Sequence, residues 1–390
     1  MVLWLVLLKG NVEPKNNNQL KKEICQMKKV KVGVIGLGEV AQIIHLPILD
    51  SLSDRFEITA LCDISEQLLQ LMGEKYRVTR LYNNPFDLCE QPDLDAVFVL
   101  NSDEYHAECA LAAMNNKKHV LIEKPMCLTQ READEIIKVR DENGVQIMVG
   151  YMRRFAPAFI EGIEEVKRLG KINYARVRDI IGQNRLIIEQ SSVVHRFNDI
   201  PEHAIQDKND RAKSMVLEAI GDVPQELGGA YRLLCGLSSH DISAMRELIG
   251  MPKRVVSAVR NEAGYINAIL EFDGFYTTFE TGVDNQRRFD AHLEVFGENK
   301  SLKIQYNTPY IRHLPTTLIV NETIGDSYSE KVIRPTFKDP YQCEIEYFYE
   351  VVTNGAQPKT TPEDYKQDLA VFKMIIEALK EAALKESFLV

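Results

Sequence analysis

Apolar and polar positions form two different patterns along the 390 residues of this chain. In the first part, short and wholly apolar runs alternate with longer segments that carry apolar residues at helical spacing. Such runs are typical of parallel strands that are buried on both faces and joined by helices. In the later part the apolar positions recur with period two, as in strands with one exposed face. The pattern predicts an α/β domain followed by an α+β domain.

The first predicted domain covers residues 29–151 and has the alternation of a doubly wound parallel sheet, with helices on both faces. Thr129 and Glu132 form a capping box, which starts a helix that ends near Gly144. The strands of this domain are expected at residues 31–36, 56–62, 95–100, 119–122 and 146–150.

The second predicted domain covers residues 152–390 and combines helices with a large, open, mostly antiparallel sheet. Asp273-Gly274 is a strong hairpin signal between two of its strands. Apart from residues 212–220, residues 183–226 show little periodicity. We therefore expect an insertion without structure of its own that acts as a lid or contacts the substrate, with disorder as the alternative. Strands are expected at residues 174–181, 255–259, 268–272, 276–280, 292–296 and 302–304, and helices at 157–169, 341–352 and 365–384.

The first apolar run closes on a glycine turn that reads Gly36-Leu37-Gly38-Glu39-Val40-Ala41. Gly36 permits a tight turn, Gly38 permits close approach to a pyrophosphate, and Ala41 permits close packing of the next helix on the strand. The positive end of that helix then faces the anion. We therefore expect a bound dinucleotide, with residues 36–41 among its contacts.

The second strand ends on Asp63, about twenty residues beyond the glycine turn, where this fold hydrogen-bonds the ribose 2′-hydroxyl. A carboxylate would repel a 2′-phosphate, and the next residues, Ile64 and Ser65, bring no compensating arginine. NAD is therefore expected as the cofactor, and NADP is disfavoured.

Composition narrows the range of partners. The formal net charge of −10 argues against nucleic acid or an anionic membrane as the main partner. Seven cysteines without a Cys-x-x-Cys pair indicate buried thiols in a reducing compartment and predict a cytoplasmic protein. No histidine stands at a metal-ligand spacing, so no metal is expected. Met1 to Leu8 is too short to span a bilayer, and residues 1–28 are expected to form a disordered extension.

Lys124 is the first candidate for chemistry. It follows a wholly apolar strand at the edge of the sheet where ligands bind in this architecture, and Pro125 keeps its backbone extended. Beside a cationic nicotinamide, a desolvated lysine has a lowered pKa and can exchange a proton near neutrality. The alternative is a solvated lysine at a strand end.

Three motifs resemble the glucose–fructose oxidoreductase and inositol dehydrogenase family, called Gfo/Idh/MocA. They are the glycine turn with the following His45-Leu46-Pro47, the run His119-Val120-Leu121-Ile122-Glu123-Lys124-Pro125, and Gly150-Tyr151-Met152-Arg153-Arg154-Phe155. The resemblance extends over roughly residues 30–380. It implies that the lysine lies beside the nicotinamide and the substrate hydroxyl. It also implies a cofactor cleft lined by Asn101, His106, Glu123, Lys124 and Arg154.

His240 is the second candidate for chemistry. Apolar positions from Ile242 to Ile249 mark a helix, with Ser239 as its expected N-cap, so His240 would lie in the first turn and be kept neutral by the positive helix end. The resemblance implies a catalytic histidine at this helix start. Family members often have an acid four residues earlier, where this chain has Gly236, and Asp241 is a partial substitute.

These features predict an NAD-dependent dehydrogenase that acts on a secondary hydroxyl of a sugar, inositol or related polyol. Lys124 and His240 would transfer the proton of the hydroxyl group, while Arg153 and Asp241 are candidates for binding the substrate. For Arg153 and Arg154 a surface salt bridge is the alternative. Two other functions stay open, namely an NAD-dependent glycosidase that oxidises its substrate transiently, and a dinucleotide-binding regulatory protein without catalysis. The open sheet predicts a homodimer or homotetramer.

Overall fold

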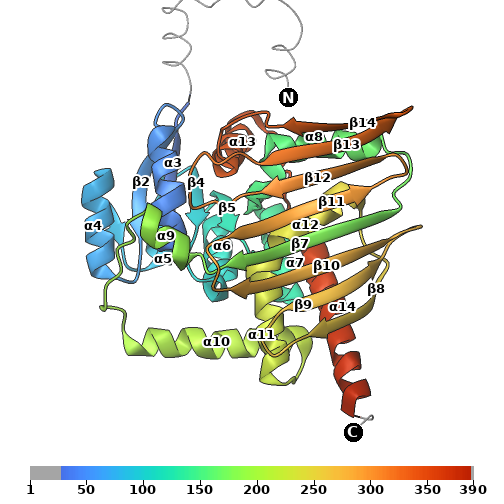
Figure 1. The fold of residues 1–390 in the computed structure, drawn as a ribbon. Helices are drawn as coiled ribbons and strands as arrows, with labels where there is room; N and C mark the ends of the chain where they lie inside the picture. Colours follow the sequence, from blue (N-terminus) through green and yellow to red (C-terminus); the bar gives the residue numbers. More distant parts are fainter. Residues whose placement is uncertain (1–27, 388–390) are drawn as a thin grey trace, which may run out of the picture.

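The computed structural model describes residues 28–387 and has two sheets, one from each half of the chain (Figure 1). The predicted N-terminal extension lies, apart from Lys28, outside the described residues. Between residues 28 and 387, no helix is long and apolar enough to cross a membrane. The six cysteines in this part of the chain are all free.

The first sheet has six parallel strands in the order β3-β2-β1-β4-β5-β6, which confirms the doubly wound prediction. The order reverses direction beside β1, and in such sheets ligands bind at this crossover, beyond the carboxyl ends of the strands. The strands are β1 (Val30–Ile35), β2 (Phe56–Cys62), β3 (Leu81–Tyr82), β4 (Ala96–Val99), β5 (His119–Glu123) and β6 (Ile147–Gly150).

Short helices connect the strands of this sheet. Ser65 caps α4 by accepting a hydrogen bond from Leu68 N, and the predicted capping box of Thr129 and Glu132 is present at the start of α7. Gly144 ends α7 in the left-handed conformation, as expected. The helices are α3 (Leu46–Ser51), α4 (Glu66–Tyr76), α5 (Pro85–Cys89), α6 (His106–Asn115) and α7 (Gln130–Asn143).

A helix from the far end of the chain, α13 (Pro340–Asn354), also packs on the first sheet. Its Phe348 meets Phe98 of β4 edge to face, with the ring centroids 5.6 Å apart. Both side chains are fully buried, in a core formed mainly by the first half of the chain. The two halves of the sequence therefore share one apolar core beneath the ligand edge of the sheet.

The second sheet has eight strands in the order β14-β13-β12-β11-β7-β10-β9-β8, and β7 with β10 is its parallel pair. The α+β prediction is confirmed, and Asp273-Gly274 lies in the hairpin between β9 and β10. The strands are β7 (Tyr174–Gly182), β8 (Arg254–Arg260), β9 (Ile266–Glu271), β10 (Tyr276–Asp284), β11 (Phe289–Phe296), β12 (Lys300–Tyr306), β13 (Thr317–Ile324) and β14 (Ser327–Ile333).

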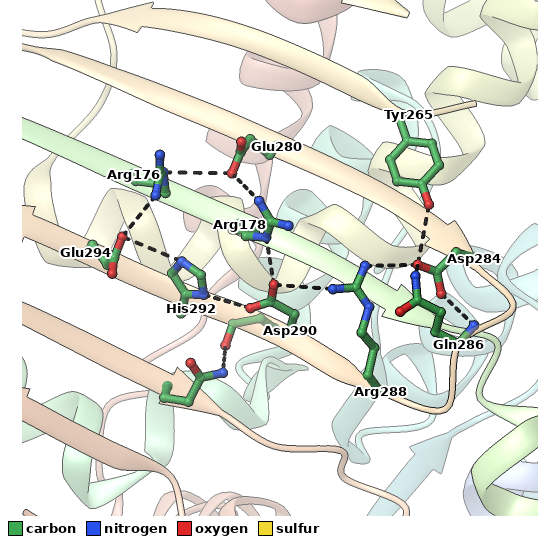
Figure 2. A network of polar contacts seen from close by, with 12 residues as sticks. Arg176, Arg178, Tyr265, Glu280, Asp284, Gln286, Arg288, Asp290, His292 and Glu294 are labelled. Carbon is green, nitrogen blue, oxygen red and sulfur yellow. Dashed lines mark hydrogen bonds and ion pairs between the residues drawn. The ribbon is translucent and has the colours of Figure 1, made fainter. Parts of the chain in front are cut away.

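Helices cover one face of the second sheet, and the other face stays open (Figure 1). Among the described residues, the helices packed on the covered face are α8 (Pro157–Lys167), α12 (Ser239–Ile249) and α14 (Pro362–Ser387). The open face carries a network of ion pairs on β7, β10 and β11, in which Arg178 contacts Glu280 at 3.1 Å and Asp290 at 2.8 Å (Figure 2).

The expectation that residues 183–226 lack regular structure is wrong. They contain α9 (Arg185–Ser191), α10 (Glu202–Ile220) and the start of α11 (Gln225–Leu233). Along the 19 residues of α10 only Ile220 is buried, but Met215, Val216 and Ala219 also pack, partly buried, against the core. The apolar spacing of residues 212–220 therefore belongs to the last turns of this helix, whereas its mostly polar first half gives no such signal.

Candidate functional site

A cavity of about 330 Å³ lies where the carboxyl ends of β4 and β5 meet α12 and β7 of the second half. It includes most of the residues that the sequence singled out from the strand ends and from the second half of the chain. Those lining it are Val40, Asn101, His106, Glu123, Lys124, Arg153 and His240.

The glycine turn has the geometry that a dinucleotide requires. Gly36 has φ +89°, and a Cβ atom there would lie 2.5 Å from the backbone of Asn101, so no other residue fits without displacing that strand end. At Gly38 no described atom lies within 4 Å of such a Cβ, which leaves the backbone open to a ligand. The helix that follows begins at Glu39 and contains a π-helical segment, Ala41–His45.

Asp63 directly follows β2 and is hydrogen-bonded to the backbone of the glycine turn. Its carboxylate accepts hydrogen bonds from Leu37 N at 2.7 Å and from Ser65 N at 2.9 Å. Burial raises the pKa of Asp63, and the hydrogen bonds from these backbone groups act in the opposite direction. In the cavity, Asn101 has a buried Oδ1 atom without a hydrogen-bond partner among residues 28–387. An open glycine, a carboxylate at a strand end and an unpaired amide oxygen together fit a dinucleotide.

Glu123 is held in place by His45, a residue of the His45-Leu46-Pro47 motif for which the sequence predicted no role. His45 is fully buried, and its Nε2 atom lies 2.8 Å from Glu123 Oε1. Burial on its own would raise the pKa of Glu123, but the hydrogen bond from His45 and the nearby charge of Lys124 act in the opposite direction, and this pKa lies below its usual value. His45 thus keeps an anion at the cavity, a role that its place on an apolar helix did not suggest.

His106 connects two of the strand ends that form the cavity. It is buried, with Nδ1 at 2.8 Å from the carbonyl oxygen of Pro125 and Nε2 at 3.0 Å from that of Asn101. The peptide bond between Lys124 and Pro125 is cis. His106 is therefore a buried residue whose hydrogen bonds hold the ends of β4 and β5 together.

Lys124 reaches from the first half of the chain to the second. Its Nζ atom donates a hydrogen bond of 2.7 Å to the carbonyl oxygen of Gly236, the residue that replaces the family's acid. Burial lowers the pKa of the Lys124 ammonium, while the charge of Glu123 raises it. A backbone carbonyl stabilises an ammonium less than a carboxylate does, so this lysine gives up its proton more readily than one in an ion pair.

His240 faces the same cavity, but the expected reason for its neutrality is wrong. Ser239 is not an N-cap, because α11 runs through a π-helical segment, Leu234–Ser238, directly into α12. His240 therefore does not lie at the free N-terminus of its own helix. Instead, burial lowers the pKa of His240 well below its usual value, and the charges of Lys124 and Arg153 add to the effect. The ring is neutral near pH 7.

Arg153 and Asp241 form a buried ion pair beside His240, not a surface contact. The Arg153 Nη1 atom lies 2.5 Å from Asp241 Oδ1, and Arg153 Nη2 lies 3.7 Å from Asp179 Oδ2. Burial raises the pKa of Asp241 well above its usual value, although Arg153 opposes it. Asp179 was missed, and the available signal was an acid at an inward position of the alternating strand β7.

Arg154 was predicted to contact the cofactor, but it lines neither the cavity nor the glycine turn. Its guanidinium is buried and paired with Glu247 of α12 and Asp364 of α14. It joins the segment that follows β6 to the two helices α12 and α14. No group of three or more histidine, cysteine, aspartate or glutamate residues within positions 28–387 could hold a metal ion.

Comparison with known proteins relates most of the chain to oxidoreductases. Residues 30–151 match a family described as an oxidoreductase family with an NAD-binding Rossmann fold. Over 366 residues the chain is 27% identical to a myo-inositol 2-dehydrogenase from Thermotoga maritima, and the match covers 90% of this chain and 97% of that one.

Solved structures share the complete fold. A myo-inositol 2-dehydrogenase from Lactobacillus plantarum has a TM-score of 0.68 at 22% identity and covers 91% of this chain and 98% of its own. A 3-ketoreductase from Actinomadura kijaniata, crystallised with NADP, has a TM-score of 0.66 at 19% identity with the same coverage of 91% and 98%.

Replacement of Gly36 by alanine tests the glycine turn. We expect Gly36→Ala to lower the free energy of unfolding by about 3 kcal/mol or more, because it adds a clash with Asn101 to the strain of a positive φ. Gly144→Ala is the matched control, since it has a similar φ and no described atom near the new Cβ, and it should cost about 1 kcal/mol. Equal losses in urea unfolding would contradict the proposed close approach.

Proposed function

The chain belongs to the Gfo/Idh/MocA oxidoreductase family, and from this premise we propose that it is an NAD-dependent dehydrogenase of a secondary hydroxyl. The substrate class would be a sugar, an inositol or a related polyol. The observation that carries this proposal is the convergence of Lys124 and His240 on one cavity beside the glycine turn. A lysine and a neutral histidine at the ligand edge are the groups that alcohol oxidation needs for its proton.

The residues around the glycine turn would hold the coenzyme. The N–H groups that follow Gly36 and Gly38 would bind its pyrophosphate, and Asp63 would accept a hydrogen bond from a ribose hydroxyl. Asn101 and Glu123 line the cavity next to this turn and would contact the nicotinamide end. When bound, the nicotinamide supplies the acceptor for the hydride of the carbinol carbon.

Lys124 and His240 would have different roles at the substrate hydroxyl. Lys124 would orient the hydroxyl group and take its proton, since burial has already lowered the pKa of its ammonium. His240 is neutral and can accept a hydrogen bond or a second proton. The buried pair of Arg153 and Asp241 fixes the wall of the cavity and offers donors to further hydroxyl groups.

The relatives support the proposed substrate class, and so do the polar side chains among the residues that line the cavity. The curated relative over the full length is named a myo-inositol 2-dehydrogenase. A screen of inositols, aldoses and polyols with NAD, read by the absorbance of the reduced nicotinamide, tests the proposal. Turnover of at least one member with net reduction supports it. A substrate consumed without net reduction would fit transient oxidation instead, and binding of NAD without any turnover would fit the regulatory alternative.

Substitution of Lys124 tests its role in proton transfer. The rate of alcohol oxidation should rise with pH until Lys124 is deprotonated, at a pH below the ordinary pKa of lysine. We expect Lys124→Met to remove this ascending limb and to lower kcat by about 10²–10⁴-fold. The control is Lys138→Met, at an exposed position of α7, which should keep both the rate and the profile. An unchanged pH profile in Lys124→Met would show that another group takes the proton.

The open face of the second sheet is proposed to pair two copies of the chain. Opposite charges alternate there, with Arg176 between Glu280 and Glu294, and His292 3.1 Å from Asp290 (Figure 2). The strand register places exposed apolar residues on the same face, at Val259, Ile269 and Tyr276 toward one edge and at Tyr328 and Val332 toward the other. A face that carries charges of both signs between two apolar edges can be self-complementary. Two copies related by a twofold axis can then pair their opposite charges and bury their apolar residues.

A lysine placed on this face tests the assembly. Ile269 is 43% exposed and its register partner Thr278 pairs with Arg176, so Ile269→Lys should leave the protomer folded and bury a charge between the copies. We expect the dissociation constant of the dimer to rise at least about tenfold in sedimentation equilibrium. Ile160→Lys, on the covering helix α8 at 47% exposure, should not change it. Loss of association in both variants, or in neither, would contradict this interface.

A further inference from the structure

A segment of the second half of the chain lies across the start of two helices in the first half. We call residues 192–200, between α9 and α10, the crossing segment (Figure 1). His195 N donates to Gln42 Oε1 at 2.9 Å, and Gln42 Nε2 donates to His195 O at 3.0 Å. Arg196 pairs with Glu39 in the glycine turn at 2.5 Å. Hydrogen bonds and an ion pair thus join the crossing segment to the turn that would bind the pyrophosphate and to the helix that follows it.

The far end of the crossing segment places a carboxylate at the start of α4. Asp199 Oδ1 accepts a hydrogen bond of 2.6 Å from Ser65 Oγ, and Asp199 Oδ2 accepts one of 2.9 Å from Gln67 N. The first N–H groups of an α-helix have no partner within the helix and attract anions. Here the anion at the first turn of the 11-residue helix α4 is part of the chain itself.

Asp199 shares this place with Asp63, the carboxylate expected at the ribose. Ser65 connects the two, because its N–H donates to Asp63 Oδ1 at 2.9 Å while its hydroxyl donates to Asp199. The hydrogen bonds from Gln67 N and Ser65 hold the pKa of Asp199 below its usual value, so it is ionised near neutrality. Two negative charges therefore meet where the 2′-position of a bound adenosine would lie.

We propose that Asp199 selects NAD against NADP by occupying the anion position at the start of α4. A 2′-phosphate would need the donors of Ser65 and Gln67, and Asp199 already holds them. It would also stand beside two carboxylates without a compensating arginine at Ile64 or Ser65. The ribose hydroxyl of NAD needs only one acceptor, which Asp63 provides. This inference rests on the coenzyme site of the proposed function and adds a second residue, from the other half of the chain, to its specificity.

A purely structural role for Asp199 makes a different prediction. If Asp199 only anchors the crossing segment, its loss loosens the cover over the coenzyme and weakens NADH and NADPH alike. If its charge selects the coenzyme, its loss changes the ratio of the two affinities. The ratio therefore separates the two roles even when the absolute affinities fall.

The test compares Asp199→Asn with wild type and with Asp210→Asn. Asparagine keeps the size and one hydrogen-bond acceptor of Asp199 and removes the charge. Asp210 is an exposed residue of α10 bonded to Gln206, so its substitution removes the same charge at a distance. Dissociation constants for NADH and NADPH are measured from the fluorescence of the reduced nicotinamide. We expect Asp199→Asn to improve the affinity for NADPH relative to NADH at least about tenfold, and Asp210→Asn to leave the ratio unchanged.

The outcomes separate this inference from the proposed function. An unchanged ratio in both Asp199→Asn and a second variant, Asp199→Ser, would overturn the role of Asp199 while leaving the dehydrogenase intact. A wild type that prefers NADPH would overturn it together with the expected choice of NAD. A folded wild type that binds neither coenzyme would instead remove the proposed function on which the inference rests.

Discussion

The hydrogen bond between Lys124 and the carbonyl of Gly236 is the constraint on which the site depends. It joins the end of β5 in the first sheet to the helix that carries His240 in the second half. Since the ammonium is buried against a neutral carbonyl, its pKa is lowered, and its remaining charge helps to keep His240 neutral. Burial is the main cause of the lowered pKa of both candidate groups, and this contact fixes the position of the ammonium whose charge lowers the pKa of His240 further. Glu123, held by His45, supplies the balancing negative charge.

Most of the fold, and the positions of the glycine turn, Asp63 and Lys124 in it, could be predicted from the sequence. A parallel strand buried on both faces must be apolar throughout, which made β1, β2, β4, β5 and β6 visible as short runs. The glycine turn was equally visible, because Gly36 has a backbone conformation and a neighbour that exclude a side chain. Asp63 and Lys124 could be placed at the ligand edge, since each ends a strand whose neighbours were known.

The parts that were missed depend on contacts between distant segments. The strand β14 is exposed at nearly every position, so it has no alternation to detect, and only the last turns of α10 carry apolar residues that pack on the core. His240 was assigned to a helix start because the apolar pattern begins at Ile242, but the helix before it continues without a break. Asp179, Asp199 and His45 gain their roles only from partners 62, 134 and 78 positions away, namely Asp241, Ser65 and Glu123.

The central claim is that a lysine stands beside the reactive ring of a bound nicotinamide. A cationic ring next to an ammonium lowers its pKa further, so binding of NAD should release protons. Calorimetric titration with NAD near neutral pH, in buffers of different ionisation enthalpy, measures this release. We expect wild type to bind NAD and release a fraction of a proton, and Lys124→Met to bind it with a smaller release. Equal proton release from the two proteins, or no binding by wild type, would contradict the account.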